Sequence, residues 1–337
     1  MRGRIILAPM EGLVDAPMRD ILTRIGGIDR CVSEFIRVTD GLLNRGTIRR
    51  IVPESQQGWR TNTGVPVHPQ LLGSDPYWLG RNAALLAELG APAVDLNFGC
   101  PAKTVNRHRG GASLLREPDT LYQIVAAVRA ALPAHVPVTT KMRLGYSDTS
   151  QTLECADALA SAGAAEIAVH ARTREQGYKP PADWDWLAWV REAVAVPIVA
   201  NGDVTDLDSY QRILTVSGCS QIMIGRGLVA CPDLARRILD AQHGQSTPML
   251  SWAGLHPWII DFYIQVRERV ADRHAPGRLK QWLVMLATHY PEARLLFDQV
   301  RRQTCAQIVQ DLLQTDSLQQ RCLASESAAA RTQAAFV

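Results

Sequence analysis

The sequence predicts a (β/α)8 TIM barrel followed by a C-terminal all-helical domain. Two observations support this prediction. Short apolar segments alternate with helix-like stretches eight times before residue 243, which is typical of a parallel sheet covered by helices on its outer face. Eight such units also match the usual size of a barrel domain, about 250 residues. After residue 243 only helical periodicity continues, so no strand is expected there.

The expected strands are short runs rich in apolar residues. In chain order they are Ile5–Met10, Cys31–Phe35, Val67–Leu72, Ala93–Gly99, Pro137–Leu144, Glu166–Arg172, Pro197–Val204 and Gln221–Gly227. Helical spacing is clearest between them at Asp75–Leu89, Glu117–Leu132, Thr152–Ala162, Trp184–Val194 and Asp206–Val216. In the first of these helices Leu79, Ala83 and Leu86 form the apolar stripe expected to face a sheet.

An open doubly wound sheet is the alternative architecture for this alternating pattern. Such a sheet normally has a Gly-rich turn after its first strand, whereas this chain has Ala8-Pro9-Met10 at that place. The barrel is therefore preferred.

The chain beyond the barrel is expected to form a second domain. Gly244–Pro248 is a polar break suited to a linker. Helical periodicity follows at Pro257–Ala271, Arg278–Thr288, Pro291–Arg302 and Ala306–Leu313. We therefore expect a barrel domain over residues 1–243, a helical domain over 249–320 and a flexible Ala/Ser-rich tail over 321–337.

Composition excludes several classes of protein. With 47% hydrophobic and 20% charged residues the chain is neither disordered nor of low complexity. No apolar run reaches membrane-spanning length and no signal peptide is visible, so we expect a cytoplasmic protein without a membrane partner. Its seven Cys include no Cys-x-x-Cys pair, so neither a disulfide framework nor a metal site is expected. We expect a monomer, in which all Cys except Cys100 are buried apolar residues.

Polar residues at the carboxyl ends of the strands are the candidates for chemistry, because barrel active sites lie there. Lys141 and Arg143 are two residues apart, so they point to the same side of their strand. A charge in the barrel mouth is costly without a polar or anionic partner. The candidates are Met10, Glu11, Gln70, Asn97, Cys100, Lys141, Arg143, His170, Arg172, Asn201, Asp203 and Arg226.

The last two strands predict a phosphate site. Asn201-Gly202-Asp203 and Gly225-Arg226 end strands seven and eight, where barrels of this kind commonly bind phosphate. Glycines allow backbone N–H groups to approach phosphate oxygens, and Arg226 adds positive charge. Two such glycines could also merely turn the chain, but their joint occurrence at these two strands favours phosphate.

Cys100 follows the fourth strand on a polar, Gly-containing loop that is expected to act as a lid. A single Cys is as often inert as reactive, so position alone leaves its role open. The loop continues through Arg107-His108-Arg109 to Gly110 and Gly111.

Several motifs occur in order along the chain: Ala8-Pro9-Met10, DLNFGCPAKTV from Asp95, KMRLG from Lys141, HARTREQGY from His170, ANGDV from Ala200 and MIGRG from Met223. Together these motifs resemble those of one family, the flavin-dependent tRNA-dihydrouridine synthases. The combination covers nearly the whole chain. The TVN…GGASLL loop and the RLKQWL segment resemble the bacterial C subgroup, which acts on uridine 16 of the tRNA D-loop. Arg107-His108-Arg109 departs from this subgroup, which is often Gly-rich there.

The resemblance implies a role for each candidate. Cys100 would donate a proton to C5 of uracil, and a reduced FMN would deliver hydride to C6. Lys141 would stabilise the anionic reduced flavin, while NADPH or NADH would bind transiently as reductant, since no Gly-x-Gly-x-x-Gly fingerprint is present. The FMN contacts would be Ala8, Pro9, Met10, Gln70, Lys141, His170, Asn201, Gly202, Asp203, Gly225 and Arg226.

The resemblance also implies a tRNA partner. Arg and Lys exceed Asp and Glu between Ile260 and Arg302, which suits phosphate contacts although such runs are often only solvated faces. The target base would leave its stack to be reduced. The expected substrate contacts are Arg37, Asn97, Arg143, Arg172, Tyr178, Arg278, Lys280 and Arg301.

Three other functions are compatible with parts of the pattern. An FMN-dependent barrel acting on a free pyrimidine, like a dihydroorotate dehydrogenase, would share the flavin site but leaves the basic helical domain unexplained. A Schiff-base aldolase using Lys141 would need neither a flavin nor Cys100. A tRNA-binding protein without catalysis would have no use for the pair Cys100 and Lys141.

Overall fold

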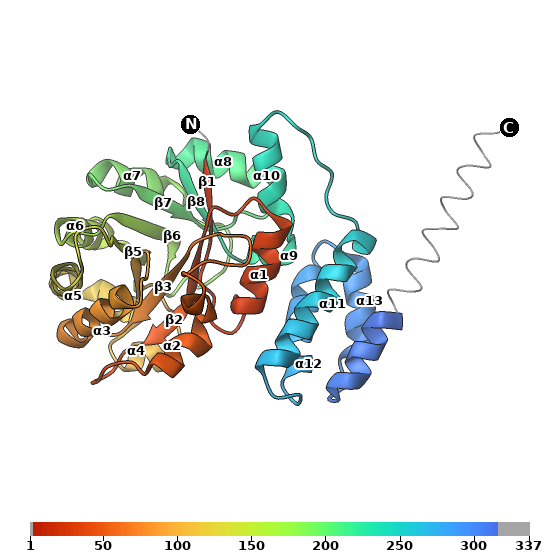
Figure 1. Ribbon diagram of the computed structural model, residues 1–337. Coiled ribbons are helices and arrows are strands. Elements are labelled where there is room, and N and C mark those ends of the chain that lie inside the picture. Colours follow the sequence, from red (N-terminus) through yellow and green to blue (C-terminus); the bar gives the residue numbers. More distant parts are fainter. Residues whose placement is uncertain (1–2, 316–337) are drawn as a thin grey trace.

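A computed structural model describes residues 3–315, and Figure 1 shows a barrel with a group of helices beside it. Eight parallel strands close the barrel in chain order, because β1 pairs with β8 as well as with β2. The strands are β1 (Arg4–Leu7), β2 (Arg30–Arg37), β3 (Val67–Leu72), β4 (Val94–Phe98), β5 (Val138–Gly145), β6 (Glu166–Thr173), β7 (Ile198–Asn201) and β8 (Gln221–Ile224). The predicted barrel is confirmed.

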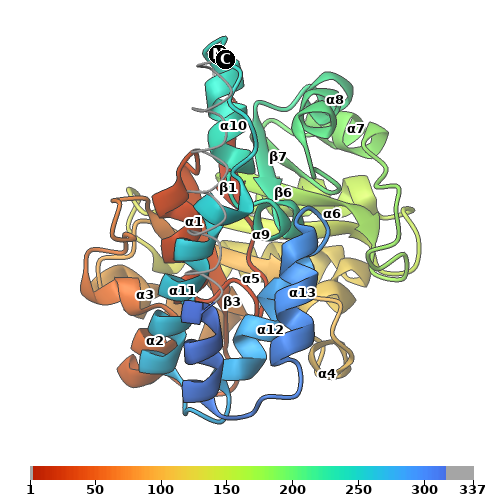
Figure 2. The ribbon, with the colours of Figure 1, turned by 90° about the vertical axis from the view of Figure 1, so that its right-hand side faces the viewer.

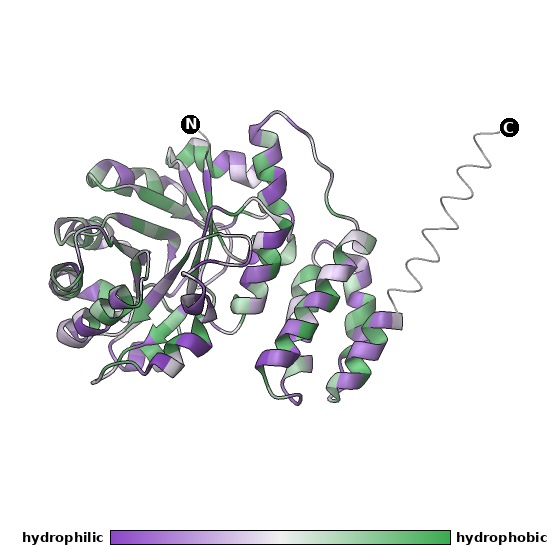
Figure 3. Ribbon diagram, viewed as in Figure 1, coloured by the Kyte–Doolittle hydropathy of each residue, from purple (hydrophilic) through white to green (hydrophobic). Residues whose placement is uncertain are grey.

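Helices surround the barrel, and apolar and polar residues alternate along them in Figure 3. Several begin at a side-chain cap: Asp75 accepts from the N–H of Trp78, and Asp206 forms a capping box with Ser209. The outer helices are α1 (Ala16–Ile25), α3 (Pro76–Glu88), α5 (Pro118–Ala131), α6 (Thr152–Ser161), α7 (Asp185–Ala193), α8 (Leu207–Ser217) and α10 (Leu234–Gln242). Shorter helices lie in the connections: α2 (Arg45–Ile51), η1 (Pro53–Gln56), α4 (Lys103–Arg107), η2 (Gly111–Arg116) and α9 (Arg226–Ala230).

Three of the expected strands were predicted three residues too long at their carboxyl ends, and the fourth strand one residue too long. The first ends at Leu7, two residues before Pro9, which has no N–H for a sheet ladder. The seventh ends at Asn201 because Gly202 and Asp203 adopt positive φ angles of 138° and 52°. The eighth ends at Ile224, since α9 already begins at Arg226. These corrections move the candidate residues from strands into loops at the mouth.

The helices after the barrel are α11 (Trp252–Arg269), α12 (Ala275–Leu286) and α13 (Pro291–Val300), followed by helical residues 306–315. The prediction that the first of them starts at Pro257 was wrong. Ser251 caps the helix and accepts from the N–H of Gly254, so Pro257 lies inside it. Residues 316–320 of the expected domain and the expected tail lie outside the described residues.

The helical group packs against the side of the barrel, and Figure 2 shows α11, α12 and α13 in front of it. Helix α11 contacts α1, and α12 contacts α9. Trp282 of α12 is buried, and its indole N–H donates to the carbonyl oxygen of Val229 at 2.9 Å. The linker therefore connects two parts that also share a packed interface.

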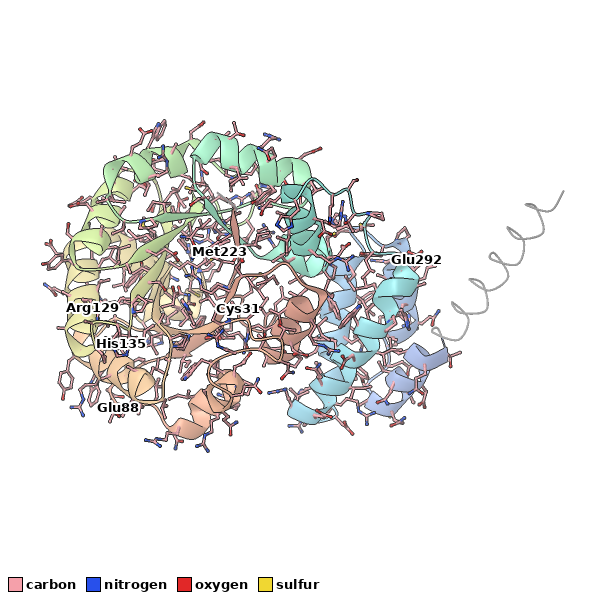
Figure 4. All side chains as sticks on the ribbon, turned by 45° about the horizontal axis from the view of Figure 1, so that its top comes forward. Cys31, Glu88, Arg129, His135, Met223 and Glu292 are labelled. Carbon is pink, nitrogen blue, oxygen red and sulfur yellow. The ribbon has the colours of Figure 1, made fainter. Side chains whose placement is uncertain are left out.

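The barrel has a small apolar core of its own inside the strands. It is formed by Ile6, Ala8, Val32, Ala168, Val199 and Met223. Met223 lies within the barrel in Figure 4, while Glu88, Arg129 and His135 lie at its outer wall. Inward-facing positions nearer the carboxyl ends of the strands are polar instead, and they form the candidate site.

The cysteine prediction holds at four positions and fails at one. Cys31, Cys155, Cys219 and Cys231 are buried free thiols, whereas Cys305 is exposed, in the turn that precedes residues 306–315. Cys322 lies outside the described residues. Among residues 3–315, no helix is long and apolar enough to cross a membrane, and no cluster of His, Cys, Asp and Glu is suited to a metal ion.

Candidate active site

The strand register gathers the predicted polar residues at the mouth of the barrel. Asn97 of β4 lies opposite Lys141 of β5, and Arg143 of β5 lies opposite His170 of β6. His170 in turn lies opposite Asn201 of β7. Because the strands are parallel, all these side chains lie near the same end of the barrel.

A chain of side-chain amides leads from the barrel interior to the loop of Cys100. The amide nitrogen of Gln70 donates to Asp95 at 2.7 Å, and the amide nitrogen of Asn97 donates to the oxygen of Gln70 at 2.7 Å. The oxygen of Asn97 accepts from the backbone N–H groups of Gly99 and Cys100, at 3.0 and 2.8 Å. Gln70 and Asn97 therefore shape the loop in addition to any ligand contact.

Cys100 is a half-buried free thiol at the rim of the mouth. Burial raises the pKa of this thiol, although the N–H of Ala102 and the charges of Arg143 and Arg37 act in the opposite direction. The thiol is therefore protonated at neutral pH. Gly111 packs against the same loop with a φ of 60°, and a Cβ there would lie 2.8 Å from the Cys100 carbonyl oxygen.

The segment expected to be a lid contains two short helices, α4 and η2. Asn106 of α4 donates to the carbonyl oxygen of Cys100 at 2.8 Å, and the N–H of Ala112 in η2 donates to the same oxygen at 3.1 Å. These two hydrogen bonds hold α4 and η2 against Cys100, the residue near which the loop begins.

Arg143 supports the Cys100 loop from the neighbouring strand. Its Nε donates to the carbonyl oxygen of Gly99 at 2.8 Å, and its Nη1 donates to the carbonyl oxygens of Thr173 and Gly177. The half-exposed ring of Tyr178 lies over this guanidinium at 5.1 Å and also 4.8 Å from that of Arg226. Tyr178 thus forms part of the outer wall of the mouth.

Lys141 is the cation at the centre of the mouth. Its Nζ donates to the side-chain oxygen of Asn201 at 2.9 Å, and it forms no ion pair within residues 3–315. Burial and the nearby Arg143 lower the pKa of Lys141 to about 7. Burial and the surrounding cations also hold the pKa of His170 well below its ordinary value, so its imidazole is neutral.

The ends of β7 and β8 form a cradle of backbone and cationic groups. Asp203 accepts from the N–H of Ala182 at 2.8 Å and pairs with the buried guanidinium of Arg172, which accounts for its unusual positive φ. Arg226 lies 4.0 Å from Asp203 and is half-exposed. Arg172 thus lies behind Asp203, and Arg226 is the cation open to a ligand.

The residues after β1 lie against this cradle. A Cβ added at Gly225 would lie 3.2 Å from the sulfur of Met10 and 3.4 Å from Ala8. At Gly227, the last residue of the MIGRG motif, a Cβ would lie 2.1 Å from the carbonyl oxygen of Val204. The turns after β7 and β8 therefore touch backbone to backbone. Ala8, Pro9 and Met10 complete the wall on this side.

A side cavity of about 450 Å³ adjoins the Cys100 loop at the ends of β2 and β3. Arg37 at the end of β2 lines it and is exposed. Trp78 and His108 lie on its other walls. Arg37 thus stands at the rim, as expected for a residue that contacts a large substrate.

The predicted basic residues of the helical part do not reach the mouth as a group. Arg278 is turned to the loop after β1: its Nε donates to Asp15 at 2.9 Å and its Nη1 to the carbonyl oxygen of Gly12 at 2.7 Å. Gly12 also donates its N–H to Glu34 at 2.6 Å. Lys280 donates to the carbonyl oxygen of Gln303 at 2.6 Å, and Arg301 is exposed. The sequence did not predict that Arg278 joins the two parts of the molecule.

Comparison with known proteins gives a consistent result. The model of the family described as dihydrouridine synthase matches residues 6–317. A tRNA-dihydrouridine(16) synthase of Aquipseudomonas alcaligenes is 54% identical over 92% of this chain and 98% of its own length. That of Pseudomonas putida is 55% identical over 90% and 95%, and that of Neisseria meningitidis serogroup A is 50% identical over 89% and 90%.

Solved structures of low sequence identity share the barrel. Histamine dehydrogenase from Rhizobium sp. 4-9 superposes with a TM-score of 0.55 at 14% identity, over 77% of this chain and 48% of that one. A morphinone reductase variant superposes with a TM-score of 0.50 at 13% identity, over 74% and 88%. At these identities the likeness concerns the fold alone.

Proposed function

The chain belongs to the dihydrouridine synthase family, and from this premise we propose that it reduces the C5–C6 double bond of uridine in tRNA to 5,6-dihydrouridine. FMN is the bound cofactor, and NADPH or NADH is the reductant. The relatives named for position 16 match almost the full chain at about half identity, which supports uridine 16 as the target. The observation that carries the proposal is a protonated thiol, Cys100, at the rim of a mouth whose central cation is Lys141.

The residues present fit an anionic flavin nucleotide. The half-buried Lys141 forms no ion pair within residues 3–315 and its pKa is lowered to about 7, so an anionic ligand would favour its protonated, positively charged form. The glycines after β7 and β8, with the half-exposed Arg226, suit a single phosphate group. Between these two points lie Ala8, Pro9 and Met10, against which a planar ring can pack. These features support FMN.

The protein's own groups then have distinct tasks. When bound, the reduced flavin supplies the hydride that reaches C6 of uracil. Cys100 donates its proton to C5, and it holds that proton at neutral pH because burial raises its pKa. Lys141 provides positive charge where negative charge accumulates, and neutral His170 lies beside it. Asn97, Arg143 and Tyr178 would orient the base at the mouth.

The first test is the reaction itself. Unmodified tRNA incubated with the protein and NADPH is expected to acquire dihydrouridine at position 16, mapped by mass spectrometry of tRNA fragments. The flavin released on heating is expected to be FMN at about one per chain, because the cradle suits one phosphate and the sequence has no Gly-x-Gly-x-x-Gly pyrophosphate fingerprint. FAD instead of FMN, or product only at other positions, would contradict the proposal.

Phosphate contacts at the rim should carry part of the tRNA affinity. Arg37→Ala is expected to weaken tRNA binding and to reduce the salt dependence of log K by about one unit of slope. Arg37 is exposed and its guanidinium forms no hydrogen bond or ion pair within residues 3–315, so its loss breaks no such internal bond. The measurement is tRNA affinity at several salt concentrations.

Arg4→Ala is the matched control, because Arg4 is an exposed arginine at the opposite end of the barrel. If log K had the same salt dependence in the Arg37→Ala and Arg4→Ala variants, tRNA would bind away from Arg37. In the helical part, Arg301 is the exposed candidate for a further phosphate contact. The Nζ of Lys280 keeps N–H groups for a tRNA phosphate beside its bond to Gln303. Arg278 already uses its N–H groups for Asp15, Gly12, Leu13 and Gln281, so it would act on tRNA through its positive charge.

A further inference from the structure

We infer that Asp95 is a positioning residue for the proposed reaction: its carboxylate ends the amide chain and thereby fixes how Gln70 and Asn97 hold the Cys100 loop. The inference rests on the proposed function, because the loop matters only if Cys100 acts on the substrate. Asp95 lies inside the barrel on β4 and reaches Cys100 only through the two amides.

The donor-to-acceptor direction along this row of side-chain amides is set at the end that contacts the Cys100 loop. Backbone N–H groups of Gly99 and Cys100 can only donate, so the atom of Asn97 that faces them must be its oxygen. The amide nitrogen of Asn97 then faces Gln70, whose facing atom must be its oxygen. The nitrogen of Gln70 consequently faces Asp95. Only an acceptor at position 95 completes this order.

The carboxylate meets that requirement from a sealed position. Asp95, Gln70 and Asn97 are 2%, 0% and 8% exposed, so water is a poor substitute for any of them. The second oxygen of Asp95 accepts from the hydroxyl of Thr139 at 2.5 Å. A buried amide N–H that loses its acceptor is left unpaired, which destabilises that arrangement. Without an acceptor at position 95, the side-chain amide of Gln70 is expected to rotate, and the amide of Asn97 to rotate with it. The Cys100 loop, which Asn97 holds, is then displaced.

A second role of Asp95 has to be separated from this one. Its negative charge favours the protonated form of Lys141. Asp95→Asn removes the charge but can keep an oxygen toward Gln70, while its new amide N–H donates to the hydroxyl oxygen of Thr139. Asp95→Leu removes both the charge and the acceptor. If hydrogen-bond polarity is decisive, the Asn variant resembles the wild type and the Leu variant does not.

The experiment uses the flavin-loaded protein and two readouts. One is the rate of alkylation of Cys100 by iodoacetamide against pH, followed by peptide mass spectrometry, which needs no tRNA. In Asp95→Leu the loosened loop exposes the thiol, so its pKa falls and alkylation at pH 7 accelerates by about 10-fold for each unit of pKa. The other is single-turnover reduction of tRNA uridine, expected to fall by about 10- to 100-fold as the thiol is misplaced.

Matched variants complete the design. Asp95→Asn is expected to stay within about threefold of the wild type in both readouts, a difference of about 0.7 kcal/mol. Thr139→Val disturbs the buried surroundings of Asp95 but leaves Gln70 its acceptor. Its pH dependence of Cys100 alkylation should therefore match that of the wild type. If Asp95→Leu does not fold, Asp95→Val, whose β-branched side chain suits a strand, replaces it.

Two outcomes overturn the inference. Equal losses in the Asn and Leu variants would assign the effect to charge on Lys141, and an unchanged Cys100 profile in both Leu and Val variants would show that the chain does not hold the loop. If the wild type forms no dihydrouridine, the proposed function fails. The alkylation profiles would still report separately whether Asp95 positions Cys100.

Discussion

Replacing Cys100 with alanine is expected to lower dihydrouridine formation by at least about 100-fold, the usual loss when a general acid is removed. Reduction of the bound flavin by NADPH should continue at the wild-type rate, because that half-reaction does not protonate uracil. The raised pKa of the Cys100 thiol makes it a proton donor throughout the neutral range, and its loss leaves C5 without that donor. Stopped-flow absorbance measures the first half-reaction, and rapid quench with nucleoside analysis measures the second.

Cys305→Ala is the control for this variant, because Cys305 is an exposed free thiol outside the barrel. It should behave as the wild type in both half-reactions. If Cys100→Ala reduced tRNA as fast as the control, another group would have to protonate C5. If flavin reduction by NADPH and reduction of tRNA uridine both slowed, the thiol would affect the flavin site as a whole and not only the protonation of C5.

The second large effect is expected at Gly227. In Gly227→Ala the new methyl group would lie 2.1 Å from the carbonyl oxygen of Val204, and neither partner is the flexible end of a side chain. The turns after β7 and β8 must then separate, at a cost of about 3 kcal/mol in the free energy of unfolding. Because these turns form the cradle proposed for the FMN phosphate, the variant should also lose bound flavin.

Gly277→Ala provides the comparison, because a Cβ at Gly277 of α12 meets no atom within 4 Å. Alanine is favoured over glycine inside a helix by about 1 kcal/mol, so this variant should be as stable as the wild type or more stable. Chemical unfolding and FMN content per chain measure both effects. Full flavin occupancy in Gly227→Ala would show that the phosphate lies away from these turns.

The sequence predicts the barrel well because each strand is short, apolar and bounded by turn residues, and the closed sheet leaves little choice of order. It fails at two places for different reasons. The helix expected from Pro257 begins earlier because Ser251 caps it, a local signal that the sequence contains. Asp203 ends its strand early in a left-handed conformation that its contacts with Arg172 and Ala182 support, and these contacts join residues distant in the chain, which a single sequence does not show.

In the candidate site, too, some features could be predicted from the sequence and others could not. Strand alternation places Lys141, Arg143 and Asn97 at one mouth, and the structure brings them together there. Asp95 could have been found by that alternation, since it lies two residues before Asn97 on the same side of β4. The role of Arg278 could not, because it depends on how the helical part docks on the barrel.

The loop after β1 is held from both sides, by Glu34 of the barrel through the N–H of Gly12 and by Arg278 of α12 through the carbonyl oxygen of Gly12. This arrangement sets a rule for engineering chimeras. A helical part transplanted from another family member needs an arginine at the place of Arg278, and the recipient barrel must retain Asp15 as its counter-ion. A fusion at the linker alone separates Arg278 from this loop, whereas a graft that carries the loop with the helices keeps the Arg278 contact and requires a glutamate at the place of Glu34 in the recipient barrel.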